Sequence, residues 1–432
     1  MMKQNSERYD DYKDSKVEWI GEIPLQWDVV RNKDIFVERG CLSVSGTETL
    51  LTVSHITGVT RRTEKNVNMF MAETMEGYKL CKKGDLIINT MWAWMGALGT
   101  NNEDIGICSP AYGVYKPRKY KPYNHRYFDY LYRIPNAIME MTRYSKGIVS
   151  SRLRLYPKDF FQIKTALPSY ETQKAIAVYL DSKTTKIDRK IELLVEKANQ
   201  YGRLKQSLIN ETVTRGLDKS AVMKDSGITW IGEIPAHWKI VRIKDIAESV
   251  NGGAFKDDLS DSGIPIIKIK QLTLNCEATD FCKPNSKKIT KGNSIKDGDL
   301  VFSWSTLIAP FIYRGEDALL NQHIFKINHS KKINRKWLYF KLSQSSQSLL
   351  AFAHGSTMQH ILKSDFDNLE IETPPLPEQT AIANFLDEKT ARIDRIVETI
   401  YFQIDKLKEL RKTLINDVVL GKIKVTKEGA TG

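Results

Sequence analysis

The chain has 432 residues, the length of two or three ordinary domains, and 41% of them are hydrophobic, which excludes a globally disordered protein. Lysine and arginine outnumber acidic residues to give a net charge of +13, which favours a polyanionic partner such as nucleic acid. The uncharged stretch 300–313 is too short and polar to span a membrane, and residues 1–15 lack an apolar signal core, so we expect a soluble cytoplasmic protein.

In chain order, each half is predicted to run from short strands and helices into one long helix. The short apolar runs are rich in β-branched residues and bounded by glycine, which is typical of strands. Prolines at Pro168 and at Pro374–Pro377 end the last strand of each half, and a helical pattern follows. Examples of the shorter elements are strands at 85–90 and 264–274 and helices at 127–132 and 337–342.

The two halves repeat one plan. Trp19–Trp27 recurs 211 positions later as Trp230–Trp238, with seven of nine residues identical. Gln173–Arg189 recurs 206 positions later as Gln379–Arg395, with 11 of 17 identical. Between these anchors the halves diverge and keep only fragments such as Gly-Asp-Leu. Similar ends around different middles predict a duplicated domain whose two copies bind different ligands. The Trp-Ile-Gly-Glu-Ile-Pro turn is expected to pack, because a ligand reader would differ between the halves.

Apolar residues in the two predicted long helices follow the same steps of four and three, a pattern typical of a coiled-coil seam. About 40 residues at 1.5 Å each would form a rod of about 60 Å. Each stripe could pack on its own domain, but two stripes with identical steps favour mutual antiparallel pairing. The stripes consist of Ile187, Ile191, Leu194, Ala198, Tyr201, Leu204 and Leu208, and of Ile393, Val397, Ile400, Ile404, Leu407, Leu410 and Leu414.

The sequence therefore predicts an α/β protein with two α/β domains related by pseudo-twofold symmetry. Two long helices that form an antiparallel coiled coil would separate these domains. The predicted parts are a first domain (1–168), a central helix (169–216), a linker (217–229), a second domain (230–375), a distal helix (376–421) and a tail (422–432).

Signatures of catalysis are missing from the sequence. It contains no Walker-type Gly-Lys-Ser/Thr, no GxGxxG and no HExxH motif. No proline is followed by aspartate, and Pro374-Pro375 lacks the neighbours that an amino-methyltransferase loop needs to hold a flipped adenine. The five cysteines and seven histidines show no metal-ligand spacing, so we expect free thiols and no zinc site. Catalysis by this chain alone is not expected.

Candidate DNA contacts lie in the divergent middles, where basic residues cluster with aromatic ones. Lysine and arginine would mostly hold phosphates, whereas donor–acceptor side chains on loops could read base edges. Many of these charges could equally be ordinary solvated surface, and Trp92, Trp94 and Trp304 are expected to pack in the cores. The candidates are Arg61, Arg62, Lys65, Asn89, Lys146, Ser150, Ser151, Arg152 and Arg154 in the first half, and Lys268, Lys270, Ser303, Ser305, Thr306, Gln322, His323, Ser356, Gln359 and His360 in the second.

These features resemble the specificity subunit of type I restriction–modification systems. The similarity runs through nearly the whole chain, and its most specific residues are Pro374 to Gln379 followed by Phe385-Leu386-Asp387 and Ile393-Asp394. The first copy departs from this pattern at Leu167–Gln173, which puts the local turn there in doubt.

The resemblance implies two target-recognition domains on double-stranded DNA and no catalysis by this subunit. It further implies two AdoMet-dependent modification subunits that methylate adenine in each half-site, and two ATP- and Mg²⁺-dependent restriction subunits that cleave DNA in phage defence. No cofactor is expected in this chain.

Two other classes of function stay open at this point. A stand-alone DNA-modifying enzyme would bind AdoMet by itself, and a non-specific interaction scaffold would bind without sequence preference or salt dependence.

Overall fold

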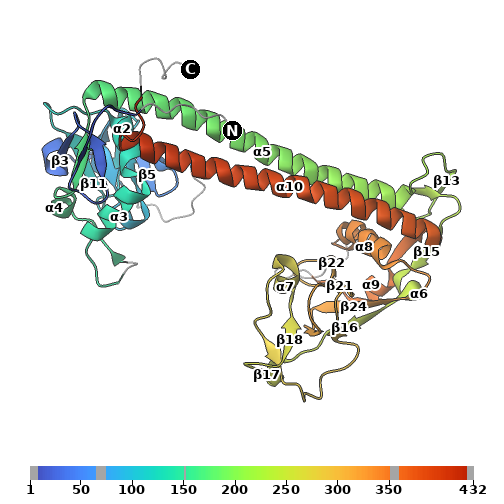
Figure 1. Cartoon of the computed structure of the whole chain (residues 1–432). Helices are drawn as coiled ribbons and strands as arrows, with labels where there is room; N and C mark the ends of the chain where they lie inside the picture. Colours follow the sequence, from blue (N-terminus) through green and yellow to red (C-terminus); the bar gives the residue numbers. More distant parts are fainter. Residues whose placement is uncertain (1–7, 65–73, 150–151, 351–359, 426–432) are drawn as a thin grey trace. The chain divides into compact units, whose positions relative to one another are not determined.

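The computed structural model describes residues 8–64, 74–149, 152–350 and 360–425, and the chain forms two compact units. Unit 1 comprises residues 1–194 and 402–432, and unit 2 comprises residues 195–401. Each unit contains an α/β domain together with one section of each long helix, α5 (Tyr170–Arg215) and α10 (Leu376–Val419) (Figure 1). The boundary between the units falls inside both long helices, whereas the sequence analysis treated each helix as one segment. The predicted segment boundaries stay a prediction. None of the described helices is long and apolar enough to cross a membrane.

Unit 1 begins with two small antiparallel pairs, β1–β2 and β3–β12, and continues with two larger sheets. One sheet has the order β4-β11-β8-β9, and the other has the order β6-β5-β10-β7, in which β5 and β10 are parallel. Its strands are β1 (Tyr12–Asp14), β2 (Glu22–Pro24), β3 (Asp28–Arg31), β4 (Phe36–Glu38), β5 (Thr49–Ser54), β6 (Gly58–Arg61), β7 (Lys79–Lys82), β8 (Leu86–Ile88), β9 (Leu98–Thr100), β10 (Ile105–Cys108), β11 (Gly113–Pro117) and β12 (Lys164–Leu167), and its short helices are α1 (Asn32–Ile35), α2 (His125–Tyr132), α3 (Pro135–Tyr144) and α4 (Pro157–Phe160).

Unit 2 repeats this arrangement, with the pairs β13–β14 and β15–β25 and a sheet of order β16-β24-β21-β22. Its other sheet has the order β17-β19-β18-β23-β20 and again contains one parallel pair, β18 with β23. Its strands are β13 (Met223–Asp225), β14 (Glu233–Pro235), β15 (Lys239–Arg242), β16 (Ala247–Asn251), β17 (Leu259–Ser260), β18 (Ile264–Ile267), β19 (Phe281–Cys282), β20 (Ser294–Ile295), β21 (Leu300–Ser303), β22 (Ala309–Ile312), β23 (Ala318–Leu320), β24 (Ile324–His329) and β25 (Glu370–Thr373), and its short helices are α6 (Ile243–Ile246), α7 (Ile269–Leu274), α8 (Arg335–Leu350) and α9 (Lys363–Asn368).

The divergent middles therefore share a sheet topology that their sequences do not reveal. The Gly-Asp-Leu fragment, which both halves keep, forms the same turn in each. Gly84 and Gly298 have positive φ values of 85° and 84°. The aspartate that follows each glycine accepts a hydrogen bond from the backbone N–H three residues before it. Each fragment makes the turn into the central strand, β8 or β21. The predicted helices at 127–132 and 337–342 are confirmed inside α2 and α8. The predicted strand at 264–274 is wrong after residue 267, where α7 begins.

The repeated Trp-Ile-Gly-Glu-Ile-Pro-x-x-Trp segment packs in the core of each unit, as predicted. Its second tryptophan, Trp27 or Trp238, is almost fully buried in the main cluster of its own unit. Each long helix ends at a glycine with positive φ beside that indole. A Cβ on Gly216 would lie 3.2 Å from the Trp238 ring, and one on Gly421 would lie 3.0 Å from Trp27. The repeated motif thus anchors the helix end to the domain.

The predicted antiparallel pairing of α5 and α10 is confirmed within each unit. In unit 1, Asp188 in the first half of α5 bonds to Arg411 in the second half of α10. In unit 2, Lys205 in the second half of α5 bonds to Asp394 in the first half of α10. In both cases a residue late in one helix faces a residue early in the other, which requires an antiparallel arrangement.

The predicted seam needs one correction at the same place in each helix. Leu204 and Leu410 are 53% and 54% exposed, whereas Lys205 and Arg411 are only partly exposed. With Lys205 and Arg411 in place of the two leucines, the steps become a regular alternation of four and three. The irregularity seen in the sequence therefore comes from a cation in the seam, because a long basic side chain can lay its apolar stem along the partner helix.

Candidate nucleic-acid interface

In unit 1 the structure brings two of the predicted DNA-contact loops together. One loop follows β8 and begins at Asn89, and the other is a turn closed by two backbone hydrogen bonds of 2.9 Å between Lys146 and Arg154. The Leu155 N–H donates to the Thr90 carbonyl at 3.0 Å, which joins the two loops. The guanidinium of Arg154 also lies 3.7 Å from the Met91 sulfur. The two loops therefore form one surface.

Unit 2 contains the same joint at the corresponding positions. The loop after β21 includes Trp304, whose carbonyl accepts a hydrogen bond of 2.9 Å from the Ile361 N–H. His360 forms a β-bridge with Ser305. A third predicted loop also joins here, because the Trp304 N–H donates to the His323 carbonyl at 3.3 Å and the two rings lie 5.3 Å apart. The predicted loops of the second half thus converge on the same edge of their domain.

Three predicted contact residues face inward here: Asn89, Ser303 and Ser305 are all buried. Asn89 and Ser303 occupy equivalent positions, because each lies four residues after the aspartate of its Gly-Asp-Leu fragment. The Asn89 side chain accepts a hydrogen bond from the Met91 N–H at 3.3 Å, and the Ser303 hydroxyl donates to the Ser305 carbonyl at 3.2 Å. Both side chains therefore brace the loop backbone. Their assignment as DNA contacts stays a prediction.

Several of the predicted cations lie in ion pairs. Arg61 contacts Glu103 at 2.6 Å, and this hydrogen bond lowers the pKa of the Glu103 carboxyl. Lys146 contacts Asp159 at 2.9 Å. Lys268 bonds to Asp280, which lowers the pKa of that carboxyl. Of the other predicted residues, Arg152, Lys270, Thr306 and Gln322 are exposed and Arg62 is partly exposed, and Lys65, Ser150, Ser151, Ser356 and Gln359 lie outside the described residues.

Three features of these surfaces were not predicted. Trp92, expected in the core, is 51% exposed next to the joint of unit 1. Ile148 and Val149 are also exposed, at the tip of the Lys146–Arg154 turn. Thr306 has a φ of +65°, a conformation that a β-branched residue adopts only under strain. Backbone strain is concentrated at functional sites, so its position in the loop after β21 supports a binding role for that loop.

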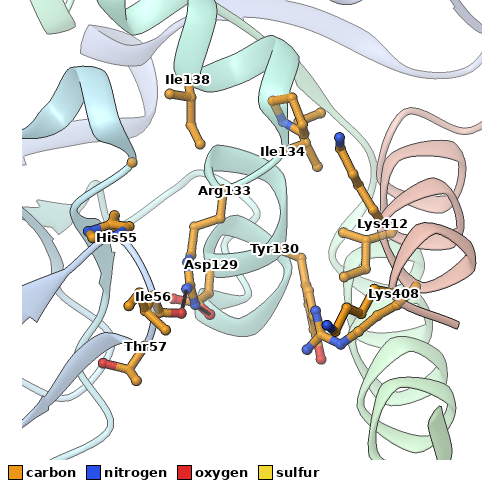
Figure 2. Close-up of a pocket in the computed structure, with 14 residues that line it drawn as sticks. His55, Ile56, Thr57, Asp129, Tyr130, Arg133, Ile134, Ile138, Lys408 and Lys412 are labelled. Carbon is orange, nitrogen blue, oxygen red and sulfur yellow. Dashed lines mark hydrogen bonds and ion pairs between the residues drawn. The ribbon is translucent and has the colours of Figure 1, made fainter. Parts of the chain in front are cut away.

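A basic cavity of about 580 Å³ lies in unit 1 between the domain and α10 (Figure 2). Arg133, Lys408 and Lys412 line it together with His55 from the turn after β5. The Arg133 guanidinium donates to the Ile56 carbonyl at 2.7 Å, and the carboxylate of Asp129 lies 3.8 Å from it. The cavity is therefore positively charged overall. No sequence motif indicated it, because its cations come from segments far apart in the chain.

Neither metal nor disulfide chemistry is visible in the described part of the chain. Among those residues, no group of three or more His, Cys, Asp or Glu side chains is placed to hold a metal ion. The five cysteines are free thiols, of which Cys41 and Cys276 are exposed.

Comparisons with known proteins agree with this architecture. Residues 235–406 match the family model of the type I restriction modification DNA specificity domain. The chain is 27% identical over 285 residues to the MjaVIII specificity subunit of Methanocaldococcus jannaschii, an alignment covering 62% of this chain and 64% of that protein. It is 26% identical over 208 residues to the EcoBI specificity subunit of Escherichia coli, covering 47% of this chain and 43% of that protein. The matches thus span less than two thirds of these relatives.

Two solved structures share the fold over almost their whole length. A chain from a structure of the complex assembly and conformational transition of a type I R-M system superposes with a TM-score of 0.71, at 16% identity, and covers 92% of this chain and 98% of that one. The HsdS subunit from Thermoanaerobacter tengcongensis superposes with a TM-score of 0.55 at 18% identity, with 93% and 98% covered. The chain therefore shares the fold of these structures, and in sequence it is similar to the specificity subunits of type I restriction–modification systems.

Proposed function

We propose that this chain is the specificity subunit of a type I restriction–modification system and that it recognises a split, asymmetric DNA site, with one half-site bound by each domain. The observation that carries the proposal is the joint found in both units, where the loop after the central strand meets a second loop through a backbone hydrogen bond. The two joints have the same geometry but different exposed side chains. One frame that presents two different surfaces is what recognition of two different half-sites requires.

In this proposal the exposed cations beside the joints hold phosphates, and the loop side chains read base edges. Arg152 and Arg154 would serve in unit 1, and Thr306, Gln322 and His360 in unit 2. Arginine and glutamine offer the bidentate hydrogen bonds that distinguish guanine and adenine, and each good pair discriminates by about 1–3 kcal/mol. The exposed Trp92 adds a flat apolar group that could pack on a sugar or a base.

The chemistry would reside in partner subunits of a cytoplasmic complex. Two modification subunits with AdoMet would methylate one adenine in each half-site, and two restriction subunits with ATP and Mg²⁺ would cleave the DNA. The duplicated helices support two copies of each partner, since they offer two nearly equivalent surfaces. This chain would itself carry out no catalysis.

A domain exchange tests the assignment of one half-site to each domain. Residues 28–165 are replaced by the matching segment of a relative, and methylated motifs are sequenced in cells that contain the modification subunit. We expect one half-site to change while the other half-site and the spacer persist. The matched control exchanges the second domain and should change the other half-site. If either exchange altered both half-sites, recognition would be shared between the domains and the proposal would fail.

We further propose that the helices set the spacer between the half-sites. Four residues added to α5 near Tyr201 would lengthen it by about 6 Å, close to two base-pair steps. A longer spacer in the methylated motif is the expected result, and an unchanged spacer would contradict this role.

A further inference from the structure

The basic cavity of unit 1 has the size of a small-molecule site. Its volume of about 580 Å³ falls in the range of about 300–1,000 Å³ that such sites occupy. Three parts of unit 1 enclose it (Figure 2): the turn after β5 at residues 55–57, the segment from α2 to α3 at residues 129–138, and the section of α10 at residues 408–415. The cavity therefore lies within one compact unit.

Positive charge predominates along the wall of this cavity. Four cations and one carboxylate line it: Arg133, Lys408, Arg411 and Lys412, with Asp129. The carboxylate is shared between two guanidiniums, since it lies 3.8 Å from Arg133 and 3.6 Å from Arg126. One carboxylate cannot neutralise both, so positive charge remains at Arg133.

The two lysines of α10 carry the charge that is least compensated. Lys408 contacts Asp405 at 3.4 Å, but both side chains are well exposed, and such a pair contributes little. Lys412 forms no ion pair with any other residue that the structure describes. By contrast, Arg411 is already held by Asp188 at 2.9 Å. Both lysines therefore remain available to a ligand.

The frame that the two units share does not require these cations. The offset of 206 between the long helices matches Lys408 and Lys412 to Gly202 and Gln206. The offset of 210 between the helix caps Asn124 and Asn334 matches Arg133 to Ser343. Unit 2 thus has the same fold without any of the three charges. Cations that gather around a cavity without a structural need indicate a ligand of opposite charge.

The rest of the wall is apolar or aromatic. Ile134, Ile138 and Ile415 line the cavity, together with the rings of His55 and Tyr130. Inorganic phosphate would leave these side chains uncovered, and an acidic peptide would match the charge but offers no planar group to the rings. A nucleobase has a flat π-face that packs on aromatic side chains whichever base it is. A nucleotide therefore matches both parts of the wall.

We propose that this cavity binds a nucleoside diphosphate or triphosphate. Arg133, Lys408 and Lys412 hold the phosphoryl oxygens, and the base packs against the isoleucines and the two rings. The Arg133 guanidinium is positioned in advance, because one of its N–H groups already donates to the Ile56 carbonyl at 2.7 Å and its other donors can meet a phosphate. The site is separate from the loops that are proposed to read DNA, so it adds a ligand to the proposed function.

Isothermal titration of the full chain with ADP, without divalent cations, tests the site. We expect one ADP per chain, because the equivalent positions of unit 2 lack the cations. Lys408→Ala with Lys412→Ala should weaken binding by about tenfold or more, since both phosphate contacts are lost. The matched control is Lys190→Ala with Lys406→Ala, which removes the same charge from exposed positions of the helices in unit 1. It should change the affinity by less than about twofold.

Three other probes identify the class of ligand. Adenosine lacks the phosphates and should not bind measurably, whereas pyrophosphate and a hexaglutamate peptide leave the rings uncovered and should bind about tenfold more weakly than ADP or worse. The proposal is overturned if ADP does not bind, if two ADP molecules bind per chain, or if the control variant loses as much affinity as the cavity variant. It is also overturned if any of the three probes binds as tightly as ADP.

Photolabelling with 8-azido-ADP locates the bound nucleotide independently of these variants. We expect the labelled peptides to contain residues 55–57, 129–138 or 408–415, and excess ADP should prevent the labelling. Labels confined to other segments would refute the assignment of the cavity. A short DNA duplex is the last competitor: if it displaced ADP, the cations would serve DNA phosphates and the proposal would fail, whereas unchanged ADP binding supports a separate site.

Discussion

Lys341 and Glu372 form an ion pair in the core of unit 2, and removing one partner should cost far more than removing both. Their side chains are 0% and 1% exposed and directly hydrogen-bonded, with Gln344 2.8 Å from the ammonium. Lys341→Met would leave the Glu372 carboxylate buried without its cation. Breaking one partner of a buried pair costs about 3–5 kcal/mol, whereas replacing both by apolar residues of similar volume is often neutral or stabilising.

Unit 1 shows that the frame tolerates an apolar pair at this place. Asn124 and Asn334 cap α2 and α8 in the same way, so Lys341 corresponds to Leu131. The strand registers likewise match Glu372 to Ala166. Both residues of unit 1 are fully buried. We therefore expect Lys341→Met with Glu372→Leu to recover most of the stability lost in Lys341→Met.

Amide hydrogen exchange measures this effect locally, because it reports the opening of the β15–β25 pair separately from the rest of the chain. If the free energy of opening this strand pair falls by about 3 kcal/mol, the backbone amides of Glu370–Thr373 should exchange about 100-fold faster. The corresponding β3–β12 pair in unit 1 is the internal control and should not change. Exchange in Lys341→Met within threefold of the wild type, or a double variant as labile as the single one, would refute the reasoning.

The pH dependence of the same strand pair has a defined sign. Burial outweighs the attraction of Glu372 and lowers the pKa of Lys341 from its ordinary 10.5. Between the lowered value and 10.5 the unfolded state binds more protons than the folded state, so stability rises with pH in that window. Protection of β25 should therefore increase as pH rises toward 10.5, and the double variant should lack this increase.

Three further substitutions test other parts of the structure. Gln379→Ala should lower the free energy of unfolding of unit 2 by about 1–3 kcal/mol in denaturant unfolding. The buried Gln379 amide accepts a hydrogen bond from the Asn334 N–H at 2.8 Å and donates one to the Pro374 carbonyl at 2.9 Å. A loss below about 0.5 kcal/mol would contradict that role. Gly202→Ala should stabilise α5 by about 0.5–1 kcal/mol, since no atom lies within 4 Å of the added Cβ, and an unchanged or lower melting temperature would count against it. Thr306→Gly should raise the melting temperature by relieving about 1 kcal/mol of backbone strain, and a lower value would show that the relieved strain is smaller than the conformational entropy that glycine adds to the unfolded state.

The sequence predicted the parts of the fold that depend on repeated core residues. Trp27 and Trp238 recur because each packs against its own helix end, so the duplication and the paired helices could be recognised before the structure. The seam was misassigned at Leu204 because an apolar pattern gives no weight to lysine, although the Lys205 stem occupies that position. The apolar run after Lys268 was predicted as strand because its isoleucines and leucines fit strand and helix equally well over a few residues.

The candidate interface was predicted less completely, because it depends on tertiary contacts. The sequence indicated the loops after β8 and β21 and the later loops separately. It could not show that Leu155 and Ile361 would join them. It also could not show that Trp92 stays exposed, because tryptophan is far more often packed than exposed.

The joints at Thr90–Leu155 and Trp304–Ile361 are made by main-chain atoms alone. Such a connection requires no particular side chain at the exposed neighbouring positions, although the buried Asn89 and Ser303 brace the backbone before it. Substitutions at the exposed positions can therefore accumulate while the scaffold persists, which on the proposed function lets one ancestral module diverge into two domains with different DNA preferences. New DNA preferences would then arise by changing a few exposed residues, with no need to reinvent the frame that holds them.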